Sequence, residues 1–297
     1  MTRFNKTYNT SAQLVQVLKE RGLHISDDAR VERYLNNIGY YRLSAYMYPF
    51  LKDPKTDHKF KDNVTFNKVL RLYRFDKKLR MLLFNEIEKI EIAFRQTVAN
   101  IAAQISGNIF WMTDVSSYSN AAKATKTISL ITNEYNKSRE DFIEHFKKTY
   151  SDPFPPAWIT AEILPLGNMT LLYSNLADQK IRKAIARTFY LHAPVLDSWM
   201  TVITLTRNSC CHHARMWNKA NPIIPNDMKK MSRPWIDPST NKRRIYYNIC
   251  IIKYFLDIIS PNNDFRDKLL SLLEQFPEID MRAMGFNNNW ENEPLWK

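Results

Sequence analysis

The pattern of residues between positions 66 and 101 constrains the fold of this chain more than any other feature. Apolar residues recur there every three or four positions, which is the period of an α-helix. They are Leu72, Phe75, Leu79, Leu83, Ile87, Ile90, Phe94, Val98 and Ile101. The spacing predicts one long helix. In a chain of 297 residues, such a helix is expected to form the spine of a helical bundle.

The rest of the sequence adds helical patterns and no alternating pattern long enough to indicate a strand. The chain is therefore expected to be all-α, a helical bundle with a small helical N-terminal region. Ser11 and residues 26–28 are suitable helix starts, and the tail from Pro277 is polar and loop-like. Further helices are expected within residues 10–37, 120–149, 157–218, 245–259 and 264–276.

These patterns divide the chain into three parts. Residues 1–64 form a helical N-terminal region with an aromatic segment at 40–50, and residues 65–260 form the main helical domain. Residues 261–297 hold a last helix and a tail.

Composition narrows the class of function. Hydrophobic residues make up 44% of the chain, which is typical of a globular protein. Only 5 glycines are present and no glycine-rich phosphate loop is found, which argues against a nucleotide-binding α/β fold. The formal net charge of +13 favours an acidic partner, either nucleic acid or an anionic membrane surface.

The sequence also predicts where in the cell the protein is located and whether it spans a membrane. Residues 1–6 are followed by no apolar run, so no signal peptide is expected, and no stretch is apolar enough to predict a transmembrane helix. Cys210, Cys211 and Cys250 do not form a disulfide framework. A reducing, cytoplasmic location is therefore expected.

The densest group of chemically capable side chains lies between positions 207 and 218. Arg207, Asn208, His212, His213 and Arg215 follow one another within barely three helical turns. Histidine exchanges protons near neutral pH, whereas arginine stays charged and grips phosphate oxygens. Together they can move protons and bind a phosphate without a metal or cofactor, which is the chemistry of RNA cleavage.

Helical geometry adds a requirement for a second copy. If the helix continues past this segment, Asn208, His212, Arg215 and Lys219 form one polar stripe, with spacings of 4, 3 and 4. Arg207 then lies roughly 140° from His212 around the helix axis. Since one helix cannot approach a phosphate from both directions, a homodimer with two facing copies is expected to complete the site.

The same residues carry a resemblance. An arginine and a polar residue followed by His212-His213, Arg215 and Trp217-Asn218 resemble the HEPN motif in the form found in the Abi (abortive infection) family. Cys210-Cys211 departs from that pattern, because small or aliphatic residues are usual there. The resemblance extends over about residues 30–220, through residues 38–46, 73–91, 156–158 with Gly167, and 172–176.

The resemblance implies a HEPN-like helical fold, dimerisation across the motif helix and metal-independent endoribonuclease activity in defence against phage. Some relatives associate with a small noncoding RNA, which makes RNA the expected partner. Arg207 would stabilise the charge of the transition state and His212 would transfer protons. Asn208 would orient either of these side chains through a hydrogen bond. His213 is the second choice for the proton transfer.

RNA-binding residues are expected around this segment and in two other places. The aromatic segment at 40–50 has two interpretations: base stacking, with Arg42 on the RNA backbone, or a core corner, which we favour because tyrosines pack well with Leu43 and Phe50. The basic loop at 219–244 either follows an RNA backbone or is simply solvated. The RNA-binding candidates are Arg215, Lys219, Arg42, Lys229, Lys230, Arg243 and Arg244.

Other interpretations of residues 207–218 predict different behaviour. A histidine pair can be a satisfied interior pair, and adjacent residues on a helix point apart, so Cys210 to His213 are not expected to bind one metal ion. No oxyanion loop accompanies a Cys–His pair. The main alternative to the nuclease is a non-catalytic RNA-binding or dimerising interaction protein with the same fold.

Overall fold

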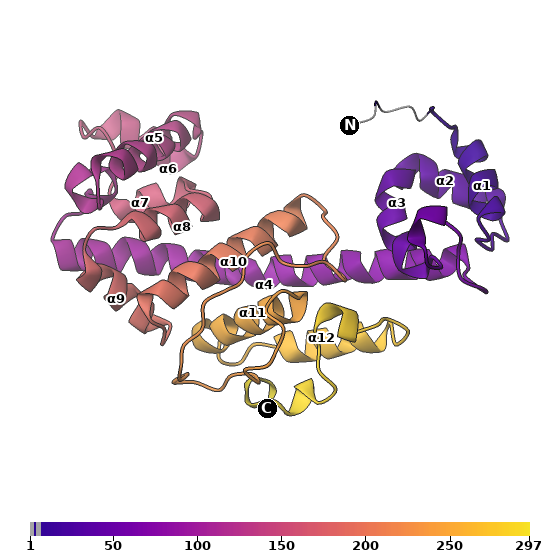
Figure 1. The fold of residues 1–297 in the computed structure, drawn as a ribbon. Helices are drawn as coiled ribbons and strands as arrows, with labels where there is room; N and C mark the ends of the chain where they lie inside the picture. Colours follow the sequence, from indigo (N-terminus) through magenta and orange to yellow (C-terminus); the bar gives the residue numbers. More distant parts are fainter. Residues whose placement is uncertain (1–2, 4–6) are drawn as a thin grey trace. The chain divides into compact units, whose positions relative to one another are not determined.

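The computed structural model describes residue 3 and residues 7–297. The expectation of no signal peptide at residues 1–6 therefore falls mostly outside the described residues. The described part contains twelve α-helices joined by loops and short 3₁₀ turns, with isolated β-bridges and no strand (Figure 1). The prediction of an all-α fold is confirmed.

The described chain forms two compact units. One contains the described residues up to Leu79 together with Leu272–Ile279, and the other contains Arg80–Ser271 with Asp280–Lys297. The division falls inside α4 (Phe66–Ser106) and α12 (Phe265–Glu274), so each of these helices contributes to both units.

The N-terminal unit begins with three short helices, α1 (Ser11–Glu20), α2 (Asp28–Ile38) and α3 (Tyr40–Met47). The cap of α1 is Thr10, which forms a capping box with Gln13, whereas the sequence had indicated Ser11. Asp27 caps α2, in agreement with the predicted start. Gly39 separates α2 from α3 with a φ of 89°, a conformation that glycine adopts without strain.

The long helix predicted from periodicity is α4. It runs five residues beyond the last position of the pattern, and its periodic apolar residues from Leu72 to Val98 are buried. Asp76 is also buried, and it accepts a hydrogen bond of 2.6 Å from the hydroxyl of Tyr46 on α3. This bond ties the aromatic segment at 40–50 to the first part of α4.

The second unit is built from α5 to α11 around the later part of α4. One predicted helix at 120–149 is two helices, because residues 138–140 leave the helical conformation between them. The helices are α5 (Ala121–Lys137), α6 (Asp141–Thr149), α7 (Ala157–Thr160), α8 (Leu166–Asn175), α9 (Gln179–Thr188), α10 (Ala193–Cys211) and α11 (Ile245–Ile259).

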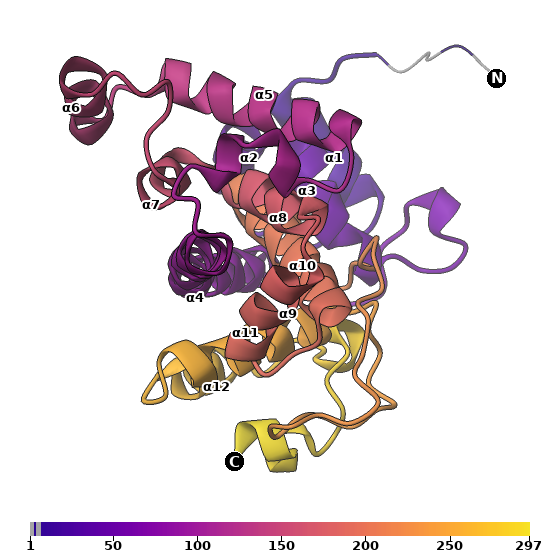
Figure 2. The same ribbon diagram turned by 90° about the vertical axis from the view of Figure 1, so that its left-hand side faces the viewer.

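Helix α10 lies at the centre of this unit, in contact with α8, α9 and α11 (Figures 1 and 2). Trp199 on α10 is fully buried and stacks on Trp235, with ring centroids 4.8 Å apart. Its indole N–H donates to the carbonyl of Asn226. The tightly packed first part of α10 therefore gives a rigid base to its C-terminal end.

The tail after Pro277 is packed, in contrast to the predicted loop. Trp290 and Trp296 lie in short 3₁₀ turns and are buried, and the indole N–H of Trp296 donates to the hydroxyl of Tyr246 on α11. The tail is polar in composition, but its few aromatic residues bury enough apolar surface to keep it packed against the rest of the protein. Within the described chain, every helix is too short or too polar to cross a membrane.

Candidate functional site

The candidate motif residues lie at the C-terminal end of α10. Arg207 and Asn208 are half-buried in the last turn of the helix, and His212 is the exposed residue that caps it. His213 follows, also exposed, with a φ of 56°. The structure therefore brings the four residues predicted to be catalytic together at one helix end.

The helix ends at Cys211, earlier than predicted. The N–H of Ala214 donates to the carbonyl of Ser209, and the N–H of His213 donates to the carbonyl of Cys210. These two bonds form a Schellman motif, in which the left-handed residue is usually glycine and here is His213. The predicted helical stripe through Asn208, His212, Arg215 and Lys219 is therefore wrong, because the last two residues follow the turn.

Two contacts from other parts of the chain hold this turn. The buried Arg80 on α4 donates a hydrogen bond of 3.2 Å to the carbonyl of Ala214. The buried Trp217 donates from its indole N–H to the carbonyl of Asp280. The chain after His213 therefore packs against the protein, which fixes the backbone on which both histidines are mounted.

Arg207 is positioned by two residues of α4. Its Nε lies 3.7 Å from an oxygen of Glu91, and its guanidinium carbon lies 5.9 Å from the ring centroid of Phe84. The other oxygen of Glu91 accepts a 2.8 Å hydrogen bond from Arg95. Since Arg207 is 32% exposed, its charge is held from one side and open to solvent on the other.

An exposed apolar surface lies beside Arg207. Met81, Phe84 and Ile92 are spaced by three and eight residues, which places them on one face of α4. They are 63%, 42% and 52% exposed, respectively, which is unusual for large apolar side chains that share a face. We refer to these three residues as the α4 stripe.

The remaining RNA-binding candidates behave differently from one another. Lys219, Lys229, Lys230 and Arg243 are exposed, and Arg215 is half-buried. The backbone N–H of Asn221 donates to the carbonyl of Arg243, so the two ends of the basic loop meet just after Lys219.

Two of the RNA-binding candidates, Arg244 and Arg42, are less suited to act together with the residues at the end of α10. Arg244 donates a 2.9 Å hydrogen bond to the side chain of Asn218, so part of its guanidinium is used within the fold. Arg42 is exposed on α3, in the N-terminal unit. It therefore belongs to a different unit from the residues at the end of α10.

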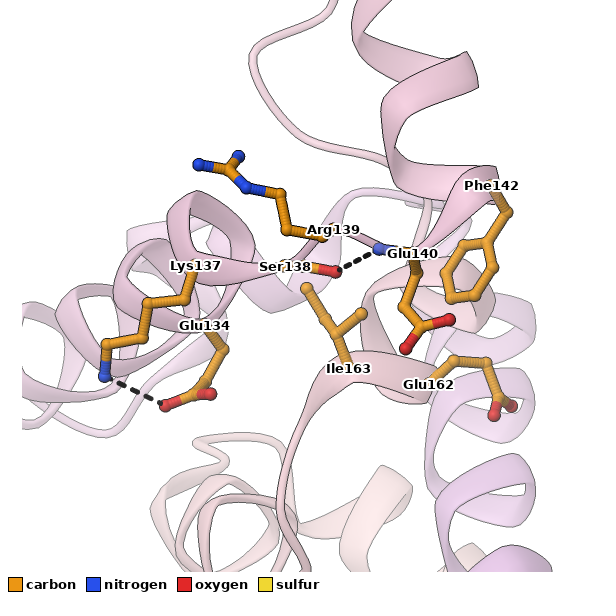
Figure 3. A pocket seen from close by; sticks show the side chains of 8 residues that line it. All are labelled: Glu134, Lys137, Ser138, Arg139, Glu140, Phe142, Glu162 and Ile163. Carbon is orange, nitrogen blue, oxygen red and sulfur yellow. Dashed lines mark hydrogen bonds and ion pairs between the residues drawn. The ribbon is translucent and has the colours of Figure 1, made fainter.

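A separate hollow of about 590 Å³ lies where α5, α6 and the 3₁₀ turn Ala161–Ile163 approach one another (Figure 3). It contains none of the predicted residues. Lys137 turns toward Glu134, and the other carboxylates of the lining come from Glu140 and Glu162. With three carboxylates against two cations, this hollow does not have the charge that binds a phosphate backbone.

The sequence did not identify the contribution of α4 to the site. Arg80, Phe84 and Glu91 lie on the side of α4 that meets the end of α10. Glu91 also forms an ion pair with Arg95, four residues later on the same helix. In the described residues, no group of three or more His, Cys, Asp or Glu side chains is arranged to hold a metal ion.

Comparison with known proteins assigns the chain to a family. A family model described as Abi-like protein matches residues 33–218, which is more than half of the chain, and the protein belongs to this family. The matched region includes α4, the whole of α10 and the turn that follows it. Membership associates the chain with abortive infection. No curated protein and no solved structure matches it.

Proposed function

We propose that this protein is a metal-independent endoribonuclease of the HEPN type that acts as an abortive-infection effector. One observation carries the proposal: Arg207, Asn208, His212 and His213 lie together at the end of a rigid helix in a member of the Abi-like family. Arg207 and the two histidines are accessible from solvent at that place.

The chemistry follows from the properties of these side chains. An imidazole removes the proton of a ribose 2′-OH, whose oxygen attacks the adjacent phosphorus. The bond from phosphorus to the 5′-oxygen breaks, and that oxygen takes up a proton from a protonated imidazole on the opposite side of the site. The products are a 2′,3′-cyclic phosphate and a 5′-hydroxyl. Arg207 stabilises the charge that develops on the phosphate oxygens.

A second copy of the chain supplies the opposite half of this site. His212 serves as the proton-transfer group in each copy, and proton transfer of this kind contributes about 10²–10⁴-fold to rate. The α4 stripe supports the dimer, because exposed large apolar side chains on one helix face are typical of interaction surfaces, and Phe84 of the stripe lies beside Arg207.

The test is RNA cleavage in the presence of EDTA by the wild type and by the Arg207→Ala and His212→Ala variants. We expect cleavage by the wild type alone, with cyclic phosphate ends, and none at a position that carries a 2′-deoxy sugar. Equal cleavage by all three proteins would refute the assignment. RNA binding by all three without any products would instead identify the non-catalytic RNA-binding protein.

A further inference from the structure

The N-terminal unit contains a second surface with the properties of a binding site. A hollow of about 1050 Å³ lies between α1, α3 and the loop that follows α3. Its floor is apolar, and Leu18, Met47 and Phe60 are buried there. This volume is near the upper end of the range for small-molecule pockets, which suits an extended ligand.

Three tyrosines border this hollow with their rings in solvent. Tyr8 is 88% exposed, Tyr41 is 92% exposed and Tyr48 is 55% exposed. The aromatic segment at 40–50 is therefore divided, because Tyr46 is buried in the core while Tyr41 and Tyr48 are not. The exposed rings contribute little to the core, so packing alone does not explain them.

Apart from the tyrosines, the ionisable side chains that line the hollow are basic. No aspartate or glutamate lines it, whereas Arg21 and His58 do. Arg21 donates a 2.8 Å hydrogen bond to the hydroxyl of Tyr40, which holds the guanidinium at the surface of the hollow. The ammonium group of Lys55 lies 5.4 Å from the centroid of the Tyr48 ring, but its charge is partly balanced by Asp53, which is 3.7 Å away.

We propose that this hollow, between α1 and α3, binds single-stranded RNA by stacking unpaired bases on Tyr8, Tyr41 and Tyr48. Sequence-tolerant single-strand sites combine a cationic groove with exposed aromatic rings. Asn9 also lines the hollow and offers its amide to base edges, whereas Asn36 offers its NH2 group, because its amide oxygen accepts a hydrogen bond from Ser11. Base-paired RNA does not present its base faces to such rings.

The choice of RNA as the occupant rests on the function proposed above, but the hollow and its rings do not. This surface belongs to the N-terminal unit, and the candidate catalytic residues belong to the other. Binding at the hollow is therefore expected to be separable from cleavage. An acidic peptide could form ion pairs with the basic side chains, but its carboxylates would not stack on the three exposed tyrosine rings.

The experiment uses the full chain and a labelled single-stranded RNA of ~15 nucleotides, a length near the known site sizes. Its riboses are 2′-O-methylated, so that the wild type cannot cleave it by the proposed route. Binding is measured by fluorescence anisotropy for Tyr41→Ala, Tyr48→Ala and Tyr41→Phe. Tyr150→Ala is the matched control, because Tyr150 is 55% exposed, like Tyr48, and lies outside the hollow.

We expect each alanine variant of the hollow to bind about 5- to 150-fold more weakly, the range for loss of one stacked base. Tyr41→Phe and Tyr150→Ala should bind like the wild type, and duplex RNA of the same sequence should be insensitive to the hollow variants. Unchanged binding by both alanine variants would overturn the proposal. Displacement of the RNA by polyglutamate as efficiently as by unlabelled RNA would also overturn it, because the binding would then depend on charge alone.

The two proposals fail in different ways. Loss of binding in the alanine variants of a protein that cleaves no RNA would refute the nuclease and support the single-strand site. Cleavage that depends on His212, together with unchanged binding in those variants, would refute the site and support the nuclease.

Discussion

Arg207 and Glu91 form an ion pair that is too long to be a hydrogen bond. The Nε of Arg207 lies 3.7 Å from the nearer oxygen of Glu91 and has no hydrogen-bond partner among the described residues. The guanidinium is therefore oriented by charge without being saturated. Its Nε is buried, so a phosphate would meet the terminal amino groups of the guanidinium, while Arg95 takes the other oxygen of Glu91.

Glu91→Gln should lower the rate of RNA cleavage while strengthening RNA binding. The amide keeps the size of the side chain but no longer orients Arg207 by charge, and a small misplacement of a catalytic group can cost ~10-fold or more in kcat. Removing a carboxylate next to a phosphate site should lower KM. The measurement is steady-state cleavage of a short labelled RNA.

Glu88→Gln is the control for this prediction, because Glu88 is exposed on the same helix three residues earlier. It removes the same charge from α4 and, at a protein concentration high enough to keep the dimer formed, should leave kcat unchanged. If Glu91→Gln and Glu88→Gln have the same kcat, Glu91 does not position Arg207.

His213 occupies a backbone position that suits glycine, so its replacements should differ sharply in stability. His213→Gly keeps the φ of 56° without strain, whereas His213→Val places a β-branched residue there. We expect the valine variant to be less stable than the glycine variant by ~1–3 kcal/mol, measured by urea unfolding. Equal stability of the two would show that the turn relaxes.

The His213→Gly variant also tests which of the two histidines transfers protons during cleavage. If His212 transfers the protons, His213→Gly should retain most of the cleavage activity, because the turn is preserved and only the second imidazole is lost. A loss as large as that of His212→Ala would assign the proton transfer to both residues or to His213.

The long helix was predictable because its signal is local and repeated. Each apolar residue of α4 from Leu72 onward reinforces the same period, and α11 was found with its full bounds, Ile245–Ile259, for the same reason. The chemically capable residues were also visible, since Arg207 to His213 are close in sequence.

The end of α10 was not predictable from its own residues. No glycine or proline marks it, and His213 takes the left-handed position instead. The carbonyl of Ala214 is bound by Arg80, which lies more than a hundred positions earlier in the chain. Likewise, the pairing of Glu91 with Arg207 depends on helix packing, which the helical period does not specify.

Tyr254 should make the protein sensitive to alkaline pH. Burial raises the pKa of Tyr254 from about 10 to about 12, and its hydroxyl donates to the carbonyl of Phe189. Since the unfolded state loses this proton at lower pH, stability should fall as pH rises from 10 to 12. The loss from this one residue is at most ~2.7 kcal/mol.

The measurement is the unfolding free energy between pH 9 and 12 for the wild type and Tyr254→Phe. The phenylalanine variant should show a shallower decline, because it has no proton to lose at that position. Parallel curves for the two proteins would show that Tyr254 ionises at the same pH in both states.

The α4 stripe should control both assembly and cleavage if the proposed site needs two copies. Ile92→Lys and Met81→Lys place a charge on an apolar surface whose burial contributes about 1.5–3 kcal/mol per side chain. We expect each to weaken a dimer by about 10- to 100-fold in Kd, measured by analytical ultracentrifugation, and to lower cleavage at dilute protein.

Val115→Lys is the matched control, because Val115 is 60% exposed in the same unit and lies off α4. It should change neither assembly nor activity. Restoration of cleavage in Ile92→Lys at high protein concentration would confirm that only association was weakened, because the catalytic side chains are unchanged. Full activity of a protein that sediments as a monomer would show instead that one copy of Arg207 and His212 forms a complete site, and the requirement for a dimer would be wrong.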